Sequence, residues 1–359
     1  MRKGRALLAA LLPLFAGCAS YVTHKIEHPA ISHGRLPDYF HENLAAQGFG
    51  KSSMRTTDGV RMAYWLGPPH VYDITETFTL LGDGPSYHWN MRLPEKPFDG
   101  SRLRARGSIV LLHPWEGEGA MLAGWAYHLA SAGYVTVLPD LRSQGESDKA
   151  PVGYGPREGR DIAELVRDLR AKQQLPEPGF LMGVSYGATA AVFAASELGD
   201  VRGVITLEPY GNAADVIRRA PSTNLFGPRW LGSVIGASNM DAAIKRASTD
   251  LGVDLAHIDT AGALAHAPCT LILRGGNDPL VSAQTLKALT DASARVRYIE
   301  LSGENHITLP LRTDRLLQPM LDWMQALAAS PDTACPAFVP LPSSVRASGP
   351  RPQGITGGT

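Results

Sequence analysis

A serine between two glycines marks the first candidate for chemistry in this sequence. Gly183, Ser185 and Gly187 form a G-x-S-x-G pattern where the apolar segment 180–184 runs into the predicted helix 186–198. A serine hydroxyl becomes an effective nucleophile when a neighbouring imidazole takes its proton during attack. Glycines on both sides favour a tight turn that holds the hydroxyl clear of the backbone, because side chains there would crowd the turn. The pattern therefore predicts a nucleophile.

Short apolar segments alternate with helical stretches over most of the chain, and they predict the elements that position this serine. Such alternation is typical of βαβ units, in which a mostly parallel sheet carries helices on both faces. The predicted core strands are residues 108–115, 134–140, 180–184, 201–209, 269–276 and 296–303. Upstream, Gly and Pro clusters separate three further segments, which we expect to form antiparallel strands at one edge of the sheet: 60–66, 72–80 and 87–93.

The remaining segments define the predicted domain organisation. Residues 19–54 are expected to be a linker, and residues 55–330 a single α/β domain. The segment 210–267 contains helix-like stretches but no strand of comparable quality. We therefore expect a helical lid there, over the carboxyl ends of the strands where open α/β sheets bind their ligands. The final stretch, 331–359, is rich in Pro, Gly and Ser and is predicted to be a mobile tail.

The strand, serine turn and helix resemble the corresponding part of an α/β-hydrolase, and the resemblance extends over roughly residues 55–329. It implies an α/β-hydrolase fold and a catalytic order of nucleophile, acid and histidine, each on a loop after a core strand. Ser185 is then the nucleophile. His306, the only histidine after Asp278, follows the last predicted strand and precedes the last predicted helix, where this family keeps its base.

Two residues compete for the role of the acid in that order. Asp278 follows a predicted core strand, and the run from Gly275 to Val281 matches the family's G-x-x-D-x-x-V pattern. Glu208 ends the preceding core strand, a position from which some relatives draw their acid. The match favours Asp278, which would fix the tautomer of His306 and stabilise its imidazolium form.

Attack on a carbonyl produces a tetrahedral oxyanion, which needs fixed hydrogen-bond donors. The resemblance implies that one donor is the backbone N–H of Tyr186, directly after the serine. The second should lie in the loop after the first core strand, where the family usually has His-Gly and this chain has His113-Pro114-Trp115. Because proline has no N–H, Trp115 is the expected donor. Trp115 and Tyr186 are also expected to line the substrate pocket.

The first 18 residues have the layout of an export signal. Three basic residues precede an apolar run at 6–15 that is too short to span a membrane. The segment 15–18 resembles the lipobox of bacterial lipoproteins, which implies a signal peptide over 1–18 and lipidation of Cys18. Ala19 after this cysteine resembles the pattern of lipoproteins that are sent to the outer membrane. The resemblance implies a lipid-anchored protein of the bacterial envelope at the outer membrane, facing the periplasm. A plain secretory signal with an incidental cysteine is the alternative.

The charge balance and the cysteines limit the expected partners. Lys+Arg and Asp+Glu both total 34, so no global positive field favours nucleic acid. The chain has no zinc-type cysteine pair and no P-loop, and we expect neither a metal nor an organic cofactor. Cys269 and Cys335 either form a disulfide that ties the tail to the core or remain thiols, and the sequence leaves both possibilities open.

The predicted function is hydrolysis of a carboxylic ester, or of an amide or thioester, through an acyl-enzyme on Ser185. The substrate would be a small-molecule or lipid-like ester, and no motif specifies its identity or the oligomeric state. One alternative is a peptidase of the same fold, whose substrate amine would need an anionic partner such as Glu116, Glu118 or Glu208. A second alternative is an acyltransferase, which differs only in what displaces the acyl group. A third is a non-catalytic binding protein of the envelope that retains the fold.

Overall fold

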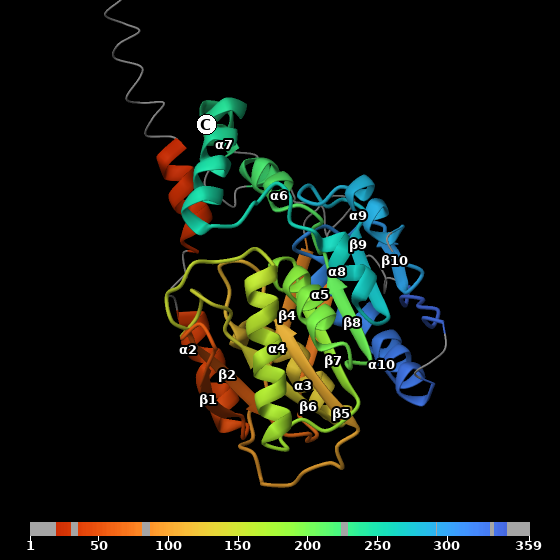
Figure 1. Cartoon of the computed structure of the whole chain (residues 1–359). Helices are drawn as coiled ribbons and strands as arrows, with labels where there is room; N and C mark the ends of the chain where they lie inside the picture. Colours follow the sequence, from red (N-terminus) through yellow and green to blue (C-terminus); the bar gives the residue numbers. More distant parts are fainter. Residues whose placement is uncertain are drawn as a thin grey trace, which may run out of the picture.

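An eight-stranded sheet forms the centre of the computed structural model, which describes residues 19–29, 35–80, 87–223, 229–291, 293–330 and 334–342. The strand order is β1-β2-β6-β5-β7-β8-β9-β10 (Figure 1). The strands are β1 (Gly50–Arg55), β2 (Arg61–Gly67), β5 (Gly107–Leu112), β6 (Tyr134–Pro139), β7 (Gly179–Val184), β8 (Gly203–Leu207), β9 (Thr270–Gly275) and β10 (Val296–Leu301). Neighbours from β6 to β10 pair in parallel, whereas β1 with β2 and β2 with β6 are antiparallel. The predicted mostly parallel sheet is confirmed.

The central strands explain where a site can form. Every residue of β5, β7, β8 and β9 is buried. Strands covered on both faces have no polar side to alternate with, which accounts for their continuous apolar sequences. Because these strands run parallel, their carboxyl ends meet at one edge of the sheet. The loops that follow them are therefore brought together at that edge.

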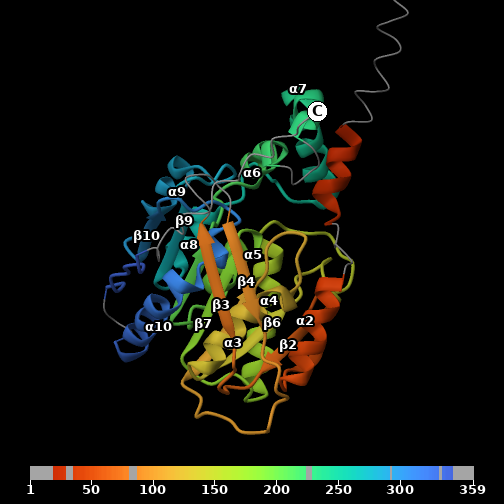
Figure 2. The same ribbon diagram turned by 180° about the vertical axis from the view of Figure 1, so that it is seen from behind.

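Helices cover both faces of the sheet, and each face has its own apolar cluster. One face carries α4 (Pro156–Ala171), α5 (Tyr186–Leu198), α8 (Thr260–His266) and α9 (Ala283–Thr290). The opposite face carries α2 (Arg35–Ala46), α3 (Ala123–Ser131) and α10 (Thr313–Ala329), as Figure 2 shows. This arrangement confirms the prediction of helices on both faces.

A separate hairpin corrects the prediction for the strands upstream of the core. The segment at 60–66 does form β2 near the sheet edge, but β3 (Thr75–Leu80) and β4 (Tyr87–Arg92) pair only with each other in a second, two-stranded sheet. Alternation of apolar and polar side chains predicts a strand with one covered face. This alternation does not specify which other strand a given strand pairs with. The position of the β3–β4 hairpin is therefore known only from the tertiary structure.

The predicted linker at 19–54 is largely ordered secondary structure. Residues 19–27 are helical, and α2 and β1 follow. Val22 and Ile26 are buried four residues apart, as are Phe40 and Leu44, so each helix buries one apolar stripe. The linker prediction was wrong for these elements because two apolar residues per helix are a weak signal in a polar segment.

The predicted lid at 210–267 is helical: it contains α6 (Ala213–Arg219), η2 (Ala220–Thr223), α7 (Arg229–Leu251) and α8. Of these, α8 packs against α5 and belongs to the helical layer of the core. The other helices stand at the carboxyl end of the sheet, with α7 beside the N-terminal helix at 19–27 (Figure 1). Thr23 donates a hydrogen bond to the carbonyl of Ala243 in α7.

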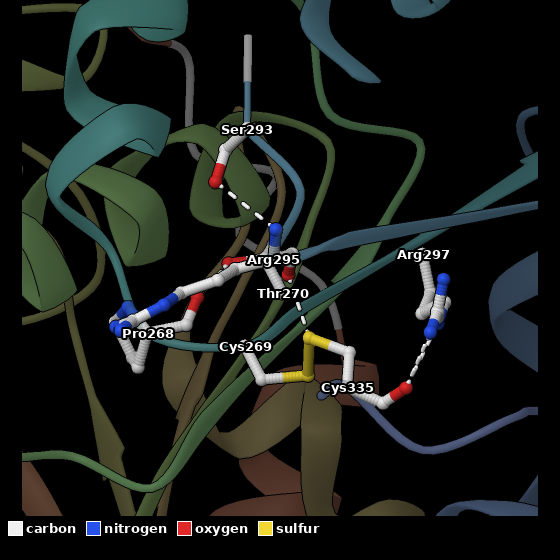
Figure 3. The surroundings of a disulfide bond; sticks show 7 residues. All are labelled: Pro268, Cys269, Thr270, Ser293, Arg295, Arg297 and Cys335. Carbon is white, nitrogen blue, oxygen red and sulfur yellow. Dashed lines mark hydrogen bonds between the residues drawn. A yellow bond between two sulfur atoms is a disulfide. The ribbon is translucent and has the colours of Figure 1, made fainter. Parts of the chain in front are cut away.

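A disulfide between Cys269 and Cys335 ties part of the tail to the core, with 5.4 Å between the two Cα atoms (Figure 3). The Arg297 guanidinium donates two hydrogen bonds to the carbonyl of Cys335, at 2.9 and 2.7 Å, and Phe338 is buried. The prediction of a mobile tail was therefore wrong for residues 334–342. Composition suggested mobility, whereas a covalent bond to a distant strand imposes order. The rest of the predicted tail lies outside the described residues.

The predicted lipid anchor is not among the residues that the structure describes. The signal peptide at 1–18, including Cys18, lies outside the described residues. Within the part that is described, none of the helices has the length and apolar character needed to cross a membrane.

Candidate active site

Ser185 occupies a strained turn between β7 and α5. Its backbone φ is positive, with φ 50° and ψ −109°, a conformation that is uncommon for a residue with a side chain. A Cβ at Gly183 would lie 2.2 Å from the carbonyl oxygen of Gly187, and one at Gly187 would lie 2.3 Å from that of Leu112. The predicted need for glycine on both sides is confirmed, because backbone atoms occupy the space a side chain would take.

His306 lies in the loop between β10 and α10, and its Nε2 is 2.8 Å from the Ser185 hydroxyl oxygen. The loop is held by its own hydrogen bonds. The Asn305 side chain accepts from the backbone N–H of Ile307 and Thr308, and the Thr308 hydroxyl accepts from the N–H of Asn305. These bonds fix the loop on both sides of the imidazole, whose side chain is only 10% exposed.

Asp278 lies in the turn after β9, and its Oδ2 is 2.8 Å from Nδ1 of His306. Its other oxygen accepts from the backbone N–H of Leu280 at 2.7 Å and of Val281 at 3.2 Å, so the carboxylate is held in place. Burial by itself would raise the pKa of Asp278. Hydrogen bonding and charge from His306, with a hydrogen bond from Glu208, hold that pKa below its usual value.

Glu208, the competing acid in the sequence, lies beside Asp278 rather than in hydrogen-bond contact with His306. It directly follows β8, and its Oε1 accepts from the backbone N–H of Gly275 at 2.6 Å. Burial, followed by the neighbouring Asp278 carboxylate, raises the pKa of Glu208 to about 10. This raised pKa keeps Glu208 protonated at pH 7, so it does not place a second negative charge beside the Asp278 carboxylate.

The same three side chains are also the group whose spacing could suit a metal ion. Ligand atoms of Glu208, Asp278 and His306 all lie within 4.8 Å of one another. However, both nitrogens of the His306 ring are engaged, one with Asp278 and one with Ser185. A protonated Glu208 is also a poor ligand. Hydrogen bonding thus accounts for this cluster without a bound ion.

The two residues that carry the expected oxyanion donors line the same cavity as Ser185. Tyr186 is the first residue of α5, and Trp115 lies in the turn after β5, with 5.0 Å between the centres of their rings. Across the described ranges, neither backbone N–H donates to a protein acceptor. The turn is braced by His113, whose Nε2 accepts from the N–H of Leu141 at 3.0 Å. Burial lowers the pKa of His113 to about 4, so this ring is neutral.

Two cavities open onto Ser185 and His306 from different sides. The first, which we call the hairpin cavity, has a volume of about 260 Å³. Its wall comes from the β3–β4 hairpin, the start of α3 and the loop before α10: Glu76, Trp89, Met91, Met121, Leu122, Gly124, Trp125, Ile307, Pro310, Leu311 and Thr313, with Pro114 and Val184.

The second, which we call the lid cavity, has a volume of about 180 Å³. It lies beneath α6 and η2, which contribute Ala213, Val216, Ile217 and Ala220. Trp115 and Tyr186 line it, as the sequence predicted, together with Pro114, Glu116, Tyr154, Tyr210, Leu280 and Ile307. Ser185 and His306 thus lie where two mostly apolar cavities meet.

Comparison with known proteins agrees with this fold. A model of the alpha/beta hydrolase family matches residues 109–319, and the chain belongs to that family. The chain is thus a hydrolase, and the predicted α/β-hydrolase fold is confirmed. No curated protein matches the sequence.

Several solved structures share the fold at low sequence identity. An esterase from Pyrococcus furiosus is 16% identical, with a TM-score of 0.53, and the match covers 84% of this chain and 97% of the esterase. A 2,6-dihydroxy-pseudo-oxynicotine hydrolase is 15% identical, with a TM-score of 0.58 and coverage of 85% and 75%. A membrane phospholipase A described as a bacterial virulence factor is 17% identical, with a TM-score of 0.50 and coverage of 93% and 100%.

The sequence did not single out Glu76, and it did not indicate the protonation state of Glu208. The neutral state of Glu208 depends on burial next to Asp278, and no local pattern reports that. Glu76 did carry a signal, because it shares the inward face of β3 with Phe78, and an acidic residue on such a face is unusual. Only the position of the hairpin shows that this face lines a cavity beside Ser185.

Proposed function

We propose that this hydrolase cleaves carboxylic esters through an acyl-enzyme on Ser185, with His306 as general base and Asp278 as the acid of a catalytic triad. The observation that carries the proposal is the unbroken chain of hydrogen bonds from Ser185 Oγ through His306 to Asp278, with 2.8 Å at each step. This geometry lies within the range that proton transfer in a nucleophile–base pair requires.

The reaction would proceed in two halves. His306 Nε2 takes the proton of the Ser185 hydroxyl as its oxygen attacks the ester carbonyl, and the resulting imidazolium is stabilised by the Asp278 carboxylate. When the tetrahedral intermediate collapses, the imidazolium returns the proton to the departing alkoxide, which leaves as an alcohol. Water then attacks the acyl-enzyme by the same route, and the carboxylic acid and the free serine are formed.

The charge on the tetrahedral oxygen would be stabilised by the backbone N–H groups of Trp115 and Tyr186. Tyr186 begins α5, and a helix N-terminus favours negative charge. Removal of one such donor typically costs about 3 kcal/mol of the barrier. Because both N–H groups are supplied by the backbone, side-chain substitutions at these positions would leave the donors in place.

Esters are favoured as substrates by the character of the two cavities. Both are lined mainly by apolar side chains, which suits the uncharged groups on either side of an ester bond. The structures with similar folds include an esterase and a phospholipase.

Labelling with a fluorophosphonate probe tests the nucleophile directly. We expect the wild-type protein to be labelled and Ser185→Ala to remain unlabelled while it keeps the same melting temperature. A chromogenic short-chain ester assayed beside an aminoacyl anilide then separates esterase from peptidase. Labelling of Ser185→Ala, or no labelling of a folded wild-type protein, would disprove the proposal.

We further propose that the protein is attached to the envelope membrane through a lipidated Cys18. The helix at 19–27 starts directly after this cysteine, and its Val22 and Ile26 share an apolar cluster with Ala243 and Ile244 of α7. An anchor at Cys18 would therefore hold α7 and the lid cavity near the membrane surface. Cys18→Ser in the full-length precursor should abolish incorporation of labelled palmitate and release the protein from the membrane fraction, and retention there would contradict the anchor.

A further inference from the structure

A carboxylate forms part of the wall of the otherwise mostly apolar hairpin cavity. Glu76 lies on β3, and its side chain is only 7% exposed. The Thr313 hydroxyl donates to its Oε2, and a Cβ at residue 124 would lie 2.4 Å from its Oε1. The carboxylate is thus seated against the start of α3, where glycine leaves room for it. Its position in the cavity is defined by the hydrogen bond to Oε2 and by the space that Gly124 leaves for Oε1.

Glu76 has no strong cation beside it. Among the described residues, no lysine or arginine nitrogen lies within 4.0 Å of its carboxylate, and the nearest basic group is Nε2 of His128 at 3.7 Å. The Arg312 guanidinium lies 4.5 Å from the centre of the ring of Phe78, which is on the same strand as Glu76. Arg312 is already paired with Glu304 and Asp314. Burial of a carboxylate without a Lys or Arg partner costs free energy, and a cation bound in the cavity would lower that cost.

Two tryptophans line the same cavity. Trp89 lies on β4, on the inward face that also carries Met91, the cross-strand partner of Glu76. Trp125 lies on α3 and is held by a hydrogen bond from its Nε1 to the carbonyl of Pro310 at 2.9 Å. Indole rings attract organic cations through their faces. Trp125 is 4% exposed and Trp89 is 37% exposed.

The lid cavity differs in this respect. Its acidic residue, Glu116, lies 3.9 Å from the ammonium of Lys25 and is neutralised within the chain. Only the hairpin cavity combines, within the described residues, a buried carboxylate without a Lys or Arg partner and two indole side chains beside Ser185. The two cavities are thus chemically different.

We propose that the hairpin cavity binds a cationic group of the substrate, a substituted ammonium on one side of the scissile ester, with Glu76 as its counter-ion and Trp89 and Trp125 against its alkyl groups. This inference rests on the proposed esterase function for its kinetic test. The lid cavity then receives the uncharged part on the other side of the ester bond. The substrate class is an ester of an amino alcohol or of an ammonium-bearing acid.

Direct binding tests the inference without catalysis. Choline and its uncharged isostere 3,3-dimethylbutan-1-ol have the same shape and differ in the charge of one atom. By calorimetry on the wild-type protein, we expect choline to bind about tenfold tighter or more, and Glu76→Gln to remove most of that difference. Glutamine keeps an acceptor for Thr313, so the fold should be retained. Equal binding of the two compounds by the wild-type protein would overturn the inference.

Kinetics on matched esters give the second measurement. Butyrylcholine and 3,3-dimethylbutyl butyrate carry the charge difference in the alcohol; ethyl trimethylglycinate and ethyl 3,3-dimethylbutanoate carry it in the acyl part. For at least one pair, Glu76→Gln should lower the cation-to-neutral ratio of kcat/KM about tenfold, with the neutral ester changed less than about threefold. Comparing this ratio between Glu76→Gln and the wild type removes the difference in intrinsic reactivity between the two esters of a pair.

Asp73→Asn is the matched control, because it removes an exposed carboxylate just before the same hairpin and should leave both ratios unchanged. Equal losses on both esters of each pair in Glu76→Gln would show that Glu76 only braces Thr313 and His128, and would overturn the inference. Failure of the esterase proposal is distinguishable, because fluorophosphonate labelling would then be absent whatever the result for choline binding.

Discussion

The carboxyl edge of the sheet and the segments that surround it are built in different ways. At the edge, Ser185, Asp278 and His306 follow the buried parallel strands β7 and β9 and the edge strand β10, and short loops hold them within hydrogen-bond distance. The walls of the two cavities come from the β3–β4 hairpin and from α6 and η2, which are additions to the sheet. Under the proposed function, reactivity would depend on the shared core and selectivity on the additions.

The largest effect should follow from damage to the edge itself. His306→Ala removes the base, and we expect kcat for a short ester to fall about 10⁶-fold with little change in the melting temperature. His257→Ala is the matched control, because that ring is 81% exposed on the surface, and its kcat should equal that of the wild type. A loss of less than about tenfold in His306→Ala would show that another group acts as the base.

A second effect should separate stability from activity. The disulfide lies at the amino end of β9, at the opposite end of that strand from Asp278, and joins residues 66 apart in the sequence. Loop entropy predicts that Cys335→Ser lowers the free energy of unfolding by about 4 kcal/mol. Denaturant titration measures this change, and kcat under native conditions should stay within about twofold. A large loss of activity in the folded variant would show that the tail supports the active site.

A smaller effect should come from the wall of the lid cavity. Val216 on α6 lines that cavity and is half-buried, so a larger side chain could extend into the space. We expect Val216→Trp to lower kcat/KM for a bulky ester about tenfold relative to a short one. The binding ratio of choline to its neutral isostere should not change, because that ratio belongs to the hairpin cavity. A change in that ratio would show that the two cavities are not independent.

The smallest effect on activity is expected for a substitution of Glu208. The effect of this substitution on the stability of the protein should, however, depend on pH. Glu208→Gln keeps an uncharged donor beside Asp278, so kcat at pH 7 should remain within about threefold. The folded-state pKa of Glu208 is raised to about 10 from an ordinary value of 4.5. Between these values the unfolded chain loses a proton that the folded protein keeps, so this group's contribution to the wild-type stability falls as pH rises.

Glu208→Gln removes that contribution. The difference in unfolding free energy, variant minus wild type, should therefore increase from about pH 5 towards pH 9. Denaturant titrations at several pH values measure it, with Glu197→Gln on the exposed part of α5 as the control. A difference that stays constant with pH would show that Glu208 is ionised in the folded protein.

Several features of this protein followed from local sequence. The mainly apolar runs of the core strands identified the sheet, because strands buried on both faces bury most of their side chains among apolar neighbours. The pattern from Gly183 to Gly187 identified the serine turn, because only glycine fits against the backbone there. His306 and Asp278 were identified by their order along the chain, because the loops that follow parallel strands all lie at the carboxyl edge of the sheet.

Other features depended on the tertiary structure alone. The hairpin could have paired with the sheet edge, and its actual position is what brings Glu76 to Ser185. The pairing of Cys269 with Cys335 and the protonation of Glu208 are set by neighbours that lie far away in sequence. Periodicity and spacing record which residues are buried within one element. Contacts between elements, and the electrostatics that follow from burial, are determined only when the chain has folded.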